Sequence, residues 1–172
     1  MATAIQPLTV EEFHHRFDGV KPYYEFWYGE AVQKSMPTWL HSVLQRLITE
    51  LLSKAGYKAG QEVELRIDPD WQPVPDVIGT MRIEQPYPTS PVEIVVEVLS
   101  PDDKTGQTLQ KCHNYARIGV RSIFVLDPER QEGWQWNAER KSLDCIKIMS
   151  LPNGEIIRLS EVWLEMMRRL DG

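Results

Sequence analysis

Two apolar segments on either side of a helix-length stretch constrain the fold most strongly. They are VEIVVEV at residues 92–98 and RSIFVLD at residues 121–127. The second is almost entirely apolar between its ends, which is typical of a strand covered on both faces of a sheet. The stretch between them predicts a helix over residues 104–118 that ends before Gly119. The residues expected to start this helix, as a cap or in its first turn, are Ser100, Pro101 and Asp103.

The remaining segments extend this alternation of strands and helices. Helices are predicted at residues 9–17, where Thr9 and Glu12 form a capping box, at 37–56 and at 160–172. Further strands are predicted at residues 62–67, 75–81, 133–138, 143–150 and 155–160, and a hairpin at 23–32 that is broken at Gly29. We therefore expect one α/β domain over residues 1–172, with a central mixed β-sheet flanked by helices.

Charge and cysteine content narrow the function classes. The formal net charge is −6, so non-specific binding of nucleic acid is not the default interpretation, although a local basic face stays possible. The two cysteines, Cys112 and Cys145, form no disulfide framework and favour a reducing compartment. The chain shows no signal-peptide pattern and no apolar run near the roughly 20 residues of a membrane span. We expect a cytoplasmic protein without membrane contact.

One carboxylate in the first apolar segment is unusual. Because side chains alternate along a strand, residues 92, 94, 96 and 98 are expected on one face, and Glu93, Val95, Glu97 and Leu99 on the other. A half-exposed strand would place Glu97 in water. If residues 92–98 instead lie beside residues 121–127, Glu97 is partly buried and needs a cation, a proton or strong hydrogen bonds. Both interpretations stay open at this point.

Two more residues are candidates for a site around Glu97. Asp76 starts the preceding strand after Pro75, where an aspartate is often only a turn residue. If that strand pairs near Glu97, the two carboxylates converge, and oxygen ligands of this kind suit Mg²⁺. Lys111 lies one turn before Tyr115 on the predicted helix, where it is either solvated or reaches toward the acids. Beside a metal-bound phosphate, a lysine can stabilise charge and orient a water.

Taken in order, these residues resemble the PD-(D/E)XK nuclease superfamily. They are more closely similar to the Uma-type family of restriction-endonuclease-like proteins, also known as domain of unknown function 820. The matching segments are YYEFWYGEAV at 23–32, His41 in TWLHSVLQRL, PDV at 75–77, VVEVLSP at 95–101, KCHNYARIGV at 111–120 and FVLDP at 124–128. The resemblance covers most of the chain. It implies a restriction-endonuclease-like fold and a Mg²⁺-dependent endonuclease, with Mn²⁺ as a substitute ion.

The resemblance also implies roles for individual residues. Asp76, Glu97 and the backbone carbonyl of Val98 would hold the metal ion. The superfamily lysine lies two residues after the glutamate, where this chain has Leu99. Lys111 would then supply the amine from the following helix. The further acid of the site would be Glu25, as a reserve ligand or a structural residue.

Two classes of function stay open from the sequence. One is a Mg²⁺-dependent endonuclease that hydrolyses DNA, with hydrolysis of another phosphate ester as a weaker variant. The other is a non-catalytic nucleic-acid-binding or protein-interaction module that keeps the fold, which the net charge and Leu99 favour. A homodimer would match the two strands of a duplex, with Trp134 and Trp136 either at that interface or in the core. His14 and His15 are expected to be solvated.

Overall fold

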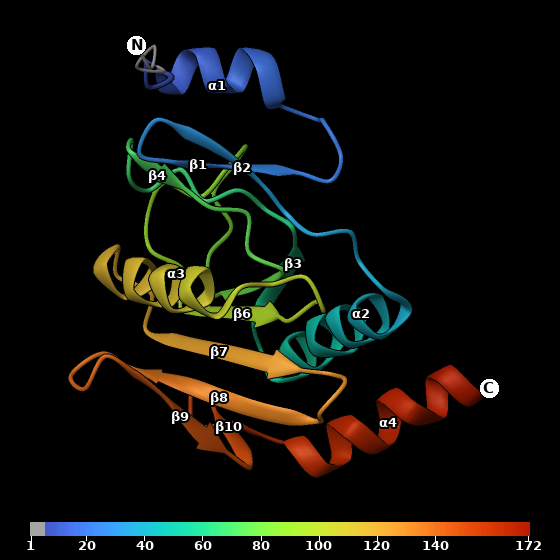
Figure 1. The fold of residues 1–172 in the computed structure, drawn as a ribbon. Coiled ribbons are helices and arrows are strands. Elements are labelled where there is room, and N and C mark those ends of the chain that lie inside the picture. Colours follow the sequence, from blue (N-terminus) through green and yellow to red (C-terminus); the bar gives the residue numbers. More distant parts are fainter. Residues whose placement is uncertain (1–5) are drawn as a thin grey trace.

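The computed structural model describes residues 6–172 and is built around a mixed β-sheet (Figure 1). The strands of this sheet are β3 (Lys58–Gln61), β5 (Val77–Thr80), β6 (Ile94–Val98), β7 (Ser122–Asp127), β8 (Glu132–Asn137) and β9 (Ser142–Ile146). They follow the order β3-β5-β6-β7-β8-β9 across the sheet. Only β6 and β7 run parallel, and the other neighbours are antiparallel. The expected α/β fold with a central mixed sheet is confirmed.

Helices cover both faces of this sheet. The bounds of the three helices are α2 (Trp39–Lys54), α3 (Thr105–Arg117) and α4 (Leu159–Asp171). The first core cluster packs α2 and α4 against Ile94, Val96 and Val98 of β6. The second packs α3 against Val95 on the opposite face of the same strand. In the described residues 6–172, no helix is long and apolar enough to cross a membrane.

A second, smaller sheet lies at one end of the molecule, opposite to β8 and β9 (Figure 1). Its strands are β1 (Tyr24–Trp27), β2 (Glu30–Gln33) and β4 (Trp71–Gln72), in the order β2-β1-β4, and α1 (Val10–Phe17) lies beside it. A short antiparallel pair, β10 (Ile148–Ser150) and β11 (Ile156–Arg158), precedes α4. The β1–β2 hairpin confirms the expectation for residues 23–32.

The predicted capping residues are confirmed for two of three helices. Thr9 and Glu12 form the capping box of α1, and the Thr38 side chain caps α2. The predicted range of α3, residues 104–118, agrees with the structure to within one residue, but the predicted capping residues are wrong. This helix begins at Thr105 with Lys104 as its N-cap and no side-chain cap. Asp103 instead accepts a hydrogen bond from the Ser100 backbone N–H at 2.7 Å, so the predicted capping residues form a turn before the helix.

The strand predicted at residues 62–67 is also wrong, because the strand lies earlier, at β3. Glu62 has a φ of +52°, which ends the extended backbone directly after Gln61. The backbone after Glu62 hydrogen-bonds to irregular segments and not to a strand. The Leu65 N–H, for example, donates to the Pro73 carbonyl. The alternating apolar residues of this stretch pack into the second core cluster without sheet pairing.

Two other expectations need correction, and one of the two alternatives for Trp134 and Trp136 is observed. Val92 precedes β6 and packs in the second core cluster, so the predicted alternation holds only from Ile94 onward. The strand predicted at residues 143–150 is interrupted at Lys147, which separates β9 from β10. Trp134 and Trp136 are half-buried and pack against the second core cluster, so their core role is observed.

The turn of the β1–β2 hairpin gives a test of this fold. Tyr28 and Gly29 have φ values of +48° and +88°, as in the two-residue turns that suit hairpin twist. A Cβ on Gly29 would also lie 2.5 Å from Pro7 Cβ. We expect Gly29→Ala to lower the free energy of unfolding by about 1–2 kcal/mol, because the left-handed backbone is strained for alanine. Urea denaturation measures this change.

The matched control is Gly106→Ala in α3. A Cβ there meets nothing within 4 Å, and its backbone is helical. This variant should be as stable as the wild type, or more stable by up to about 1 kcal/mol. Equal urea midpoints for the Gly29 variant and the wild type would contradict the account of the hairpin.

Candidate active site

Two buried carboxylates meet where the neighbouring strands β5 and β6 of the main sheet begin and end. Val77 of β5 pairs with Val96 of β6 in antiparallel register, so Asp76 lies opposite the end of β6. The backbone N–H of Val98 donates to Asp76 Oδ2 at 2.8 Å. Asp76 is 3% exposed and Glu97 is 7% exposed. The half-exposed interpretation of this strand is therefore excluded, and Glu97 needs partners inside the protein.

Asp76 is surrounded by groups that favour its charged form. The Lys34 amine donates to Asp76 Oδ1 at 2.9 Å, and His41 Nε2 lies 3.4 Å from Oδ2. Gln45 donates to the Asp76 backbone carbonyl at 2.8 Å, which fixes the start of β5 against α2. Burial alone would raise the pKa of Asp76, but Lys34 and His41 together hold that pKa well below its usual range. Asp76 is therefore a permanent negative charge.

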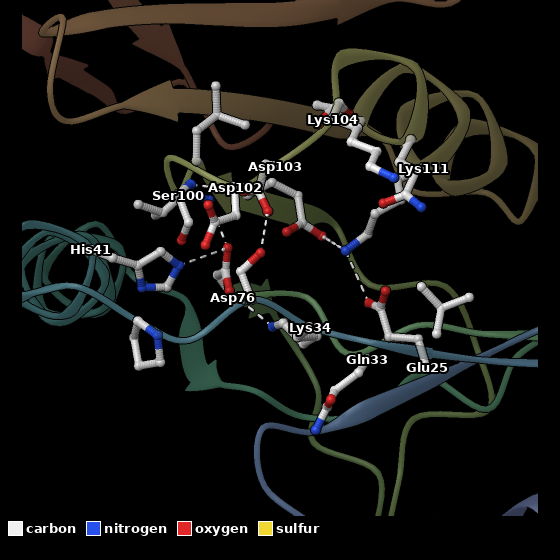
Figure 2. Close-up of a pocket in the computed structure, with 18 of the residues that line it drawn as sticks. Glu25, Gln33, Lys34, His41, Asp76, Ser100, Asp102, Asp103, Lys104 and Lys111 are labelled. Carbon is white, nitrogen blue, oxygen red and sulfur yellow. Dashed lines mark hydrogen bonds and ion pairs between the residues drawn. The ribbon is translucent and has the colours of Figure 1, made fainter.

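Lys111 lies between two other carboxylates. Its amine is 2.9 Å from Glu25 Oε1 and 2.8 Å from Glu97 Oε1. Figure 2 shows the Lys111 side chain pointing from α3 toward Glu25 across the cavity. Burial would lower the pKa of Lys111, but the charges of Glu25 and Glu97 raise it above its usual value. The lysine thus reaches Glu97 from the helix, where the strand itself carries Leu99.

Glu25 is held by three donors. Its Oε1 accepts from the Lys111 amine and from the Val74 backbone N–H at 2.9 Å, and its Oε2 accepts from Trp27 Nε1 at 3.2 Å. Both carboxylate oxygens are therefore engaged. This geometry favours a role for Glu25 in holding Lys111 in place and charged.

The carboxylates of this cluster outnumber its amines. Three buried carboxylates, Asp76, Glu25 and Glu97, face two amines, and Lys111 serves two of the acids. Burial raises the pKa of Glu97 to about 7; Lys111 offsets part of this effect, and the charge of Asp76 adds to it. The Tyr115 hydroxyl also donates to Glu97 Oε1. Glu97 is thus partly protonated near neutral pH.

The cluster opens into a cavity of about 290 Å³. The carboxylates that line it are Glu25, Glu62, Asp76, Glu97, Asp102 and Asp103, and the lysines are Lys34, Lys104 and Lys111. His41, Val98 and Leu99 also line it. Because acids outnumber lysines, the cavity attracts cations and repels a bare phosphate group.

The donor set fits a hard divalent cation. The hydrogen bonds and ion pairs of Glu97 to the described residues 6–172 all end on Oε1, and Lys34 is the one partner of Asp76 Oδ1 among them. Among these residues, Glu97 Oε2 therefore has no such partner, and Asp76 Oδ1 has one. Mg²⁺ is commonly bound through one or two carboxylates plus waters and phosphate oxygens.

A second acidic cluster lies elsewhere and has a different character. His14, Asp18 and Glu64 bring possible ligand atoms within 4.8 Å of one another. The Arg66 guanidinium already supplies a cation there, since it contacts Glu64 and lies 3.6 Å from Asp18. His14 is half-buried and 2.7 Å from Gln72 Oε1, so its predicted solvated role is wrong.

Comparisons with known proteins show the family of this chain. The model of the Uma2 family, described as "Putative restriction endonuclease", matches residues 10–164. The chain belongs to the Uma2 family. The resemblance drawn from its motifs is thereby confirmed. Among curated proteins, none matches the chain.

Solved structures place this Uma2 chain in a known fold. One is the crystal structure described as a "putative nuclease belonging to DUF820" from Anabaena variabilis ATCC 29413. Its TM-score is 0.79 at 17% identity, and the match covers 93% of this chain and 99% of that chain. This likeness shows the same fold. A DrdV–DNA complex has a TM-score of 0.41 at 13% identity, covering 72% of this chain and 10% of that chain.

No pattern in the sequence indicated two residues that contribute to the site of this Uma2 protein. Gln45 lies in the predicted long helix, and nothing in its spacing indicates that it faces Asp76. Lys34 follows β2, and its backbone N–H bonds the Tyr23 carbonyl at 2.9 Å. The hairpin register is the signal that would have found it, because pairing residue 23 with residue 34 brings Lys34 back toward the acids.

The proton on Glu97 gives a test by pH. The folded-state pKa of about 7 lies above the ordinary 4.5, so the folded state binds more protons than the unfolded state between these values. The proton on Glu97 therefore adds to the free energy of unfolding at low pH, and this contribution is lost as the pH rises from about 4.5 to 7. We expect this loss, on the order of 3 kcal/mol, to disappear in Glu97→Gln. Urea unfolding at pH 5 and pH 7.5 measures it.

The control for this test is Glu93→Gln. Glu93 lies just before the same strand and accepts a hydrogen bond from the Met81 backbone N–H, outside the cavity. Its variant should keep the pH dependence of the wild type. If the Glu97 variant and the wild type have parallel stability profiles, Glu97 does not carry the proton.

Proposed function

We propose that this Uma2-family protein is a divalent-metal-dependent endonuclease that hydrolyses DNA phosphodiester bonds. The observation that carries the proposal is the buried pair Asp76 and Glu97 with the Lys111 amine 2.8 Å from Glu97. The description of the family as restriction endonucleases supports DNA as the substrate. Mg²⁺ is the proposed ion, with Mn²⁺ as a substitute. An enzyme acting on chromosomal or invading DNA would work in the cytoplasm.

Each residue has a distinct role in this proposal. Asp76, Glu97 and the carbonyl of Val98 are the proposed ligands. Bound there, the ion would polarise the scissile phosphate and lower the pKa of a water. Lys111 donates to the phosphoryl oxygens or orients the attacking water, where a charged donor is most effective in a water-poor site. Glu25 keeps that amine charged and positioned.

The acid excess of the cavity supports the need for a metal ion. A phosphate group entering a cavity with six carboxylates and three lysines meets net repulsion. A divalent cation between the acids and the phosphate removes that repulsion. A homodimer is the proposed assembly, because two sites related by a two-fold axis match the two strands of a duplex.

Substitution of the site residues tests the proposal. We expect Asp76→Asn and Lys111→Met each to lower Mn²⁺-supported cleavage of plasmid DNA by about 100-fold or more, since each removes a group aimed at developing charge. Thermal unfolding shows whether each variant keeps its fold. Gel assays of supercoiled, nicked and linear DNA measure cleavage.

The control for this experiment is Asp102→Asn. Asp102 lines the cavity but is exposed, so its variant should cleave like the wild type. Full cleavage by the Asp76 variant would reject the assigned ligands. A wild type that binds DNA and cleaves none with either metal would instead favour the non-catalytic nucleic-acid-binding module.

A further inference from the structure

Lys34 occupies an oxygen that the proposed cation needs. Its amine donates to Asp76 Oδ1 at 2.9 Å and to the Val74 carbonyl at 2.7 Å. The side chain is 11% exposed, and Figure 2 shows it pointing toward Asp76. The other oxygen of Asp76 already accepts from the Val98 backbone. A cation bound to Asp76 Oδ1 would therefore lie next to an ammonium group.

Two like charges so close inside a partly buried cavity repel each other strongly. Asp76 can therefore bind the cation through Oδ1 only after the ammonium group has moved away. Lys34 has an alternative acceptor, because Glu62 Oε1 lies 3.8 Å from its amine and is 39% exposed. Glu62 also lines the cavity, next to the end of β3. The lysine side chain is long and flexible enough to exchange one carboxylate for the other.

We propose that Lys34 competes with the divalent cation for Asp76 and that Glu62 accepts the lysine amine when the cation binds. This inference rests on the proposed metal-dependent function and adds a residue that sets how readily the site loads. Lys34 is a positioning residue in this account. It keeps Asp76 charged and fixed in the free protein, and it weakens cation binding until it moves.

Removing the amine should tighten the cation site. In Lys34→Met, Asp76 keeps the Val98 N–H and the nearby His41 as partners, and Oδ1 is free. We expect the Kd for Mn²⁺, measured by calorimetry on the full chain, to fall about tenfold or more. Lys34→Gln, which can still donate to the Val74 carbonyl, should show the same direction. It serves as the second variant if the first does not fold.

The matched control is Lys104→Met, which removes an exposed lysine from the rim of the same cavity. Its Kd for Mn²⁺ should change less than threefold. Glu62→Gln should weaken Mn²⁺ binding more than Asp102→Asn does, because both remove a rim carboxylate but only Glu62 receives the amine. Thermal unfolding of each variant shows that it is folded.

The outcomes separate this inference from the proposed function. If Mn²⁺ binds the wild type, is lost in Asp76→Asn, and binds no more tightly to Lys34→Met than to Lys104→Met, the competition is rejected and the metal site stands. An equal effect of Glu62→Gln and Asp102→Asn rejects the transfer to Glu62. If neither the wild type nor Lys34→Met binds Mn²⁺, the metal site itself is wrong, and this inference fails with it.

Discussion

The unequal number of buried acids and amines is the constraint on which the rest of this structure depends. Three carboxylates and two lysines converge at one edge of the main sheet, and water is largely excluded from them. Desolvated charges are costly unless they are closely paired, and Glu25 and Glu97 share one lysine, Lys111. Partial protonation of Glu97 near neutral pH reduces the excess negative charge in the free protein. The proposed divalent cation would more than offset the same negative charge.

Several elements that lie far apart in the sequence supply the charged residues of this cluster. The β1–β2 hairpin carries Glu25 on one strand and brings Lys34 back beyond the other. The antiparallel pairing of β5 with β6 sets Asp76 beside Glu97. Helix α3 supplies Lys111, and its Tyr115 ring packs edge-on against Trp71 at 5.0 Å between ring centroids. A shift in any of these elements would leave a buried charge without its partner.

Much of this arrangement could be predicted from the sequence, for identifiable reasons. An acid inside an apolar strand implies a nearby cation, and helical spacing puts Lys111 and Tyr115 on one face. The strand–helix–strand order around Glu97 fixed the expected sheet. These signals are local or periodic, and the structure has them as predicted.

The rest depended on tertiary contacts that no local pattern encodes. Lys34 lies beyond the predicted hairpin, yet its largely buried amine reaches the Val74 carbonyl and Asp76, just before β5. The alternating apolar pattern predicted a strand that starts at Glu62, but the left-handed backbone of Glu62 ends the extended segment there. Asp103 does not cap α3, because it accepts hydrogen bonds from the Ser100 backbone N–H and the Ser35 side chain. In each case a long-range partner outweighed the local preference.

The central claim is that Asp76 and Glu97 together bind a divalent cation. The most direct test is an anomalous difference map from crystals of the full chain soaked with Mn²⁺, recorded at the manganese absorption edge. The account predicts one strong peak between these two carboxylates, with the Lys34 amine moved off Asp76. An empty cavity, or a peak only at the His14, Asp18 and Glu64 cluster, would contradict it.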